Sequence, residues 1–114
     1  MSRDFTKYPD DENGDVLYRM CQSGDDLEII REIDFSVVFP TEDAALKFGE
    51  ILLFNRQKVS LSDYEENGDY PYDITVHVHM KPTHKEITDF EALLEKYATK
   101  YDGYNDGWGC YEQK

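Results

Sequence analysis

The sequence predicts an α+β domain built from one antiparallel four-stranded sheet with its helices on one face. Two observations lead to this class. Several segments alternate between apolar and polar residues, as in a strand with one buried face. Between them lie segments in which apolar residues recur at helical spacing. A one-sided alternation is typical of antiparallel sheets. The 114 residues are expected to form a single domain over residues 1–114.

The N-terminal half supplies a helix, a strand and a second helix. Residues 10–23 carry apolar side chains at helical spacing and are expected to form a short helix. Residues 29–39 alternate with a period of two and predict a strand that ends at Pro40. Thr41 is a favourable N-cap for the helix that the run 44–54 predicts.

The C-terminal half supplies two strands, a helix and a last strand. The strands 58–64 and 72–80 are expected to be joined by a hairpin with an Asn-Gly turn at 67–68. A Thr-x-x-Glu capping box opens a helix over about residues 83–100. The aromatic end of the chain has room for a short strand at 107–111. This order is the ferredoxin-like βαββαβ pattern, preceded by an N-terminal helix that lies against a sheet edge or partly over the open face.

The charge balance is strongly acidic. Twenty-five Asp and Glu residues against twelve Lys and Arg residues give a formal net charge of −13. Such a surface repels phosphate backbones and anionic membranes, so no direct nucleic-acid contact and no membrane contact are expected. It favours a basic protein partner.

Cysteine usage and the N-terminal sequence indicate a cytoplasmic protein. The two cysteines form neither a disulfide framework nor a Cys-x-x-Cys metal motif. No apolar N-terminal run has the character of a signal peptide or a membrane span. Both thiols are therefore expected to be reduced.

Two histidines are the candidate metal ligands. His77 and His79 lie two residues apart and share one face of a predicted strand, where they can bind one zinc ion. Asp34 on a neighbouring strand can complete the shell, although spacing fixes no third ligand. The alternative is a pair of polar side chains on a solvated sheet face. No cofactor and no catalytic residue are assigned.

The end of the chain carries its most distinctive motif. The only tryptophan, Trp108, stands between Gly107 and Gly109 and follows Asp106. Chain ends are usually polar and frayed, whereas this one is aromatic and rich in glycine. We therefore expect it to be docked on the fold, with these four residues acting as a structural element or as an interface.

Several motifs together resemble those of the RraB family, the regulators of ribonuclease E activity. The most specific is the terminal Asp-Gly-Trp-Gly, and the resemblance spans nearly the whole chain. The other matching segments are Gly14-Asp15, Gly24-Asp25-Asp26-Leu27, Ile33-Asp34-Phe35 through Phe39-Pro40, Ala44-Ala45 and Met80-Lys81-Pro82.

The resemblance implies a ferredoxin-like domain that acts as a non-catalytic protein inhibitor. The better-known members are strongly acidic, bind the endoribonuclease and alter RNA decay, and they carry an acidic extension beyond the tryptophan motif. The implied partner is ribonuclease E or another basic RNA-binding protein. The alternatives are a small metal-binding protein or enzyme that uses His77 and His79, and an interaction domain of other purpose. The oligomeric state stays open.

Overall fold

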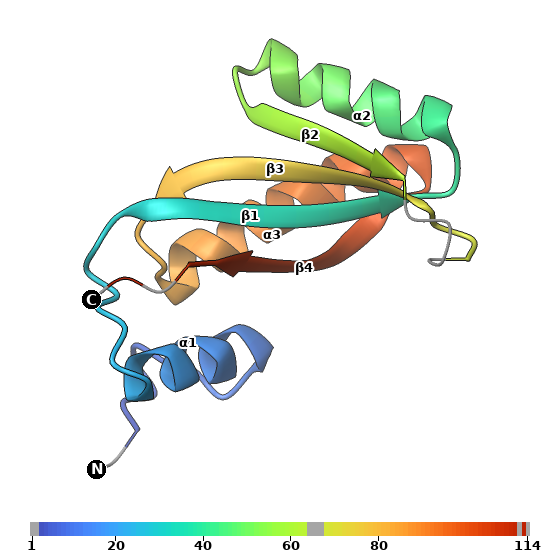
Figure 1. Cartoon of the computed structure of the whole chain (residues 1–114). Coiled ribbons are helices and arrows are strands. Elements are labelled where there is room, and N and C mark those ends of the chain that lie inside the picture. Colours follow the sequence, from blue (N-terminus) through green and yellow to red (C-terminus); the bar gives the residue numbers. More distant parts are fainter. Residues whose placement is uncertain (1–2, 64–67, 112, 114) are drawn as a thin grey trace.

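The computed structural model describes residues 3–63, 68–111 and 113 (Figure 1). It is an α+β structure in which the described residues form three α-helices, one short 3-10 helix and one four-stranded antiparallel sheet, as the sequence predicts for its class. In chain order, the elements are α1 (Glu12–Gln22), β1 (Arg31–Phe39), α2 (Glu42–Phe54), β2 (Lys58–Asp63), β3 (Tyr72–Met80), α3 (His84–Ala98), the 3-10 helix η2 (Thr99–Tyr101) and β4 (Tyr104–Cys110).

The strands follow the spatial order β2-β3-β1-β4, and all neighbours are antiparallel. Consequently β1 and β2 are parallel with β3 between them, and β3 and β4 are parallel with β1 between them. The helices α2 and α3 connect these two parallel pairs. The edges of the sheet are therefore β2 and β4.

Both connecting helices cover the same face of the sheet. Phe35 of β1 packs against Phe90 of α3, with ring centroids 4.7 Å apart. Phe39 of β1 packs against Phe48 of α2, with centroids 4.9 Å apart. Because Phe35 and Phe39 are four residues apart on one strand, they point to the same side. The core lies between this face and the two helices.

The helix α1 lies beside α3 at the β4 edge of the sheet, below β4 in Figure 1. Asn13 of α1 donates hydrogen bonds to Glu91 Oε1 (2.7 Å) and Thr88 Oγ1 (3.1 Å) of α3. Leu17 is buried in the core. Of the two placements that the sequence left open, the structure shows the one against the edge.

The last strand is longer than the sequence predicts, because the chain reverses earlier. It begins at Tyr104, whereas the prediction placed it at 107–111. Asp102 takes the left-handed conformation (φ 62°) after η2, and the Gly103 N–H donates to Ala98 O (3.0 Å). Gly103 is buried, and a Cβ there would overlap the Phe39 ring. The other boundaries differ by a few residues. The turn predicted at 67–68 lies partly outside the described residues. Tyr64, the last residue of the strand predicted at 58–64, also lies outside them.

A buried ion pair ties the segment before β1 to the end of the chain. Arg31 Nη1 lies 2.7 Å from Asp25 Oδ2, and the two side chains are 3% and 1% exposed, respectively. Arg31 Nη2 also donates to Asp26 O (2.7 Å). The hydrogen bond to Asp25 raises the pKa of Arg31. Asp26 N–H donates to Gln113 O (2.7 Å), so the end of the chain is docked here.

The face of the sheet opposite to the helices is polar but not uniformly solvated. Asp34 and Ser36 of β1 lie on it, as the alternation predicts. Val38 and Asp73 lie on the same face by the same alternation, but they are buried at 2% and 7% exposure. The Asp73 carboxylate accepts hydrogen bonds from the hydroxyls of Ser36 and Thr75. These donors compensate its burial.

Candidate functional site

A groove runs between α1 and the edge strand β4. It consists of two adjoining cavities of about 370 and 570 Å³, which share Val16 and Trp108 as lining residues. We call it the Trp108 groove. The first cavity is lined by Val16, Arg19, Met20, Ser23, Asp25, Trp108, Gly109 and Cys110, and the second by Asp11, Glu12, Asn13, Val16, Thr88, Glu91, Asn105, Asp106, Gly107 and Trp108.

The Trp108 indole is held at the junction of the two cavities. Trp108 lies opposite Phe35 in the β1–β4 ladder, so its ring is on the helix side of the sheet. Its Nε1–H donates to Asn13 Oδ1 (2.9 Å), and the Asn13 amide donates to Glu91 Oε1 (2.7 Å). Asn13 therefore connects β4, α1 and α3, and it leaves one side of a half-buried ring exposed to the groove.

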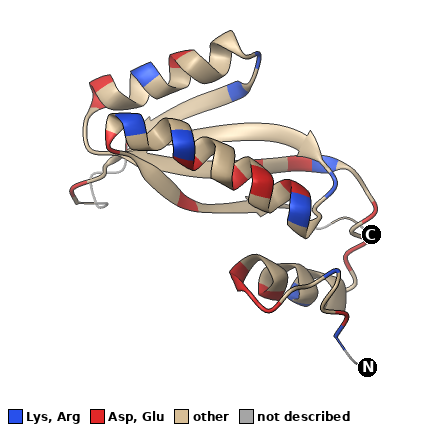
Figure 2. Cartoon of the chain, turned by 180° about the vertical axis from the view of Figure 1, so that it is seen from behind, with Lys and Arg blue, Asp and Glu red and all other residues tan. Residues whose placement is uncertain are grey.

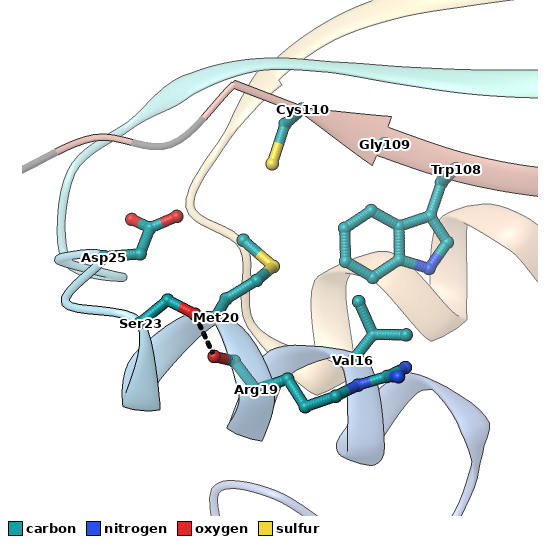
Figure 3. Close-up of a pocket in the computed structure, with 8 residues that line it drawn as sticks. All are labelled: Val16, Arg19, Met20, Ser23, Asp25, Trp108, Gly109 and Cys110. Carbon is teal, nitrogen blue, oxygen red and sulfur yellow. Dashed lines mark hydrogen bonds between the residues drawn. The ribbon is translucent and has the colours of Figure 1, made fainter.

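The first cavity has an apolar wall (Figure 3). In Figure 3 the side chains of Met20 and Cys110 point into the same space as the Trp108 ring, with Val16 below the ring. Burial is the main cause of the raised pKa of the Cys110 thiol, which Arg31 partly opposes. The thiol is therefore neutral near pH 7 and acts as part of the apolar wall rather than as a nucleophile.

The second cavity has an acidic rim. Asp11, Glu12, Glu91 and Asp106 line it, and no Lys or Arg is among its described lining residues. Figure 2 shows acidic residues at the N-terminal end of α1 and along α3. Asp11 is the N-cap of α1; its hydrogen bonds with Gly14 N–H and then with His84 lower its pKa. This part of the groove attracts cations.

The terminal motif forms the sheet side of the groove. The β1–β4 register shifts between Ser36 and Val37, which makes Asp106 an extra residue on β4. Gly107 follows with φ 120°, a backbone conformation that L side chains rarely adopt. The structure thus brings Asp106, Gly107, Trp108 and Gly109 together with α1, a partner that local sequence patterns do not reveal.

The predicted histidine pair lies on the other face of the sheet, where His77 meets the predicted Asp34 and His79 does not. His77 Nδ1 lies 2.7 Å from Asp34 Oδ1 and 3.7 Å from Glu32 Oε2. His79 is exposed and is not part of this cluster. Glu32 was not among the predicted ligands, although it shares the strand face of Asp34 by the same alternation.

The structure is thus a small, acidic α+β fold with an aromatic ring and carboxylates along one edge of its sheet. The family model described as Regulator of ribonuclease activity B (RraB) matches residues 10–110. The chain belongs to the RraB family, and its family membership makes it a regulator of ribonuclease activity. A search of curated proteins finds no match. None of the helices that the structure describes has the length and apolar character needed to span a bilayer.

Proposed function

We propose that this chain is a non-catalytic regulator that inhibits a ribonuclease E-type enzyme by binding it as a protein partner. The observation that carries the proposal is the extent of the family match. Residues 10–110 include both walls of the Trp108 groove, α1 and β4. The family match therefore covers the segment that forms the groove.

The chemistry of the groove favours a basic segment that also carries an apolar side chain. The acidic cavity suits Lys or Arg side chains, and the cavity beside Met20 and Cys110 suits an apolar one. Because β4 is an edge strand, its outer backbone groups can add hydrogen bonds to an extended segment. Such a partner matches the basic RNA-binding segments expected of the nuclease.

Inhibition then follows from competition. A basic segment bound by this acidic chain is not free to bind RNA, and no direct contact between this chain and RNA is needed. A cytoplasmic location is part of the proposal, because RNA decay takes place there.

We also propose that the chain is a single domain with the ferredoxin-like βαββαβ arrangement. The order β2-β3-β1-β4, with each parallel pair split by an antiparallel strand, supports this assignment. On this arrangement α1 is an addition to the fold, and the groove arises where the addition meets the sheet.

The proposal is tested with the full chain and the purified basic RNA-binding segment of ribonuclease E. Binding is measured by calorimetry at two salt concentrations, together with inhibition of RNA cleavage. The double variant Glu12→Gln/Asp106→Asn removes two exposed carboxylates from the groove. The control Glu42→Gln/Glu50→Gln removes two exposed carboxylates from α2 and thus makes the same change in net charge.

We expect the groove variant to lose about tenfold or more in affinity, roughly 1.4 kcal/mol, and the control to change little. Wild-type affinity should fall steeply as salt rises. Equal losses in both variants would show diffuse charge attraction and exclude the groove as the docking site. No binding of the wild type at physiological salt would exclude this segment of the nuclease as the partner.

A further inference from the structure

The open face of the sheet carries one imidazole between two carboxylates. Glu32 and Asp34 lie two residues apart on β1 and share that face, and His77 lies directly opposite Asp34 on β3. His77 Nδ1 is 2.7 Å from Asp34 Oδ1 and 3.7 Å from Glu32 Oε2. One ligand atom from each residue lies within 4.8 Å of the others.

These separations fit one small cation. Ligand atoms around a tetrahedral zinc ion, bound at about 2.0 Å, are about 3.3 Å apart. The two distances from His77 Nδ1, 2.7 and 3.7 Å, lie on either side of that value. All three separations are within 4.8 Å, so side-chain rotations can bring the three groups around an ion.

A second contact orients the imidazole for this role. His77 Nε2 lies 2.9 Å from the Ser60 hydroxyl of β2. A serine hydroxyl both donates and accepts, so it can accept a hydrogen bond from Nε2–H when the Nδ1 lone pair binds an ion. Metal-binding histidines usually donate their other N–H to such an outer partner. Three neighbouring strands thus hold the cluster.

We propose that Glu32, Asp34 and His77 form a binding site for a divalent transition-metal ion, with Zn²⁺ as the ion that the donor set fits best. One imidazole nitrogen and two carboxylate oxygens are ligands that zinc accepts, and water completes the coordination. The ion balances two carboxylates that lie side by side in a chain of net charge −13. The site is separate from the proposed docking groove and does not depend on it.

Lys58 is the native competitor of the ion. Its Nζ lies 3.8 Å from Glu32 Oε1, and its side chain is 76% exposed. An exposed ion pair of this kind contributes little and is easily displaced. Removal of the Lys58 charge should therefore strengthen metal binding, a result that a purely structural role of the cluster does not predict.

The test titrates the full chain with Zn²⁺ at neutral pH in a Cys21→Ser background, because the exposed Cys21 thiol is an adventitious ligand. Calorimetry gives affinity and stoichiometry, and imidazole NMR signals identify the histidine involved. We expect one ion per chain, with the affinity reduced about tenfold or more by His77→Gln and by Asp34→Asn. Ser60→Ala should also weaken binding, and Lys58→Gln should strengthen it.

His79→Ala is the matched control, because His79 is on the same strand but outside the cluster. It should leave the affinity unchanged. Loss of binding in His79→Ala with retention in Asp34→Asn would overturn the proposal in favour of the His77/His79 pair. Absence of binding to the wild type at millimolar Zn²⁺ would also overturn it. Melting curves without metal separate loss of ligand from loss of fold in each variant.

Discussion

Replacement of Asp25 by Asn removes the counter-charge of a buried guanidinium. The Asp25 and Arg31 side chains are 1% and 3% exposed, so the Arg31 charge cannot recover its hydration when the carboxylate is lost. Removal of one partner of a buried ion pair destabilises a protein by about 3–5 kcal/mol. The same carboxylate accepts a 3.3 Å hydrogen bond from Gln113 N–H, so the docking of the chain end weakens too.

The expected shift in melting temperature follows from the size of the chain. At about 2.1 cal/mol/K per residue, 114 residues have an unfolding entropy of about 0.24 kcal/mol/K. A loss of about 3–5 kcal/mol therefore lowers the melting temperature by about 12–21 °C. Thermal and urea unfolding, followed by circular dichroism, measure both quantities.

A second ion pair provides the control. Lys85 and Asp89 are 2.7 Å apart on α3, but their side chains are 85% and 64% exposed. Asp89→Asn should change the melting temperature little, since an exposed ion pair on a helix contributes little to stability. The comparison separates the effect of burial from that of losing one carboxylate.

Two results would refute the reasoning about Asp25. A loss below about 1 kcal/mol in Asp25→Asn would mean that the guanidinium regains water or a new partner. The double variant Asp25→Leu/Arg31→Met should be much less destabilised than Asp25→Asn, because it leaves no buried charge; a larger loss would also contradict the account. Because the pKa of Arg31 is raised in the folded state, the Arg31 charge contributes fully to stability below its unfolded pKa. This contribution is lost only as the pH rises through the folded pKa.

The remaining predictions concern two glycines and one carboxylate. Gly49→Ala should stabilise the protein by about 0.5–1 kcal/mol in urea unfolding, because the nearest atom to the new Cβ is 3.7 Å away and alanine favours a helix interior. Gly103→Ala should destabilise it by about 1–3 kcal/mol, because the new Cβ overlaps the Phe39 ring; the same sign for both changes would contradict the packing. Because hydrogen bonds lower the pKa of Asp11 in the folded state, its carboxylate stabilises the fold above the unfolded pKa of 3.8. This stabilisation is lost as the pH falls through the folded pKa. Asp11→Asn should therefore lose less stability than the wild type as the pH falls, measured by tryptophan fluorescence. Identical acid-unfolding curves for the two proteins would refute this.

The pattern of apolar residues was sufficient to predict the elements, because each strand and helix has a local period. It also placed Asp34 and His77 on one face. It did not predict which residues meet, since the hydrogen bond between Asn13 and Trp108 joins positions 95 residues apart. Pairing of this kind depends on tertiary packing, and no local signal in the sequence specifies it.

The groove could not be predicted from the sequence for a related reason. The position of α1 depends on the buried Leu17 side chain and on the Asn13 contacts to α3, whereas the pattern of the helix shows only that it is amphipathic. The length of β4 was underestimated because the reversal occurs at Asp102, a non-glycine residue with positive φ. Such a residue has no reliable sequence signature.

The terminal motif contributes to both surfaces of the sheet, because side chains alternate along a strand. Trp108 lies on the helix side and lines the groove, whereas Gly109 pairs with Asp34 on the open side. A Cβ at Gly109 would meet nothing within 4 Å, and its φ is not in the left-handed region, so neither packing nor backbone geometry requires glycine there. The bare backbone leaves the flank of the carboxylate cluster around Asp34 accessible. One short motif can therefore place an aromatic ring in the Trp108 groove and keep the proposed cation site open on the opposite face.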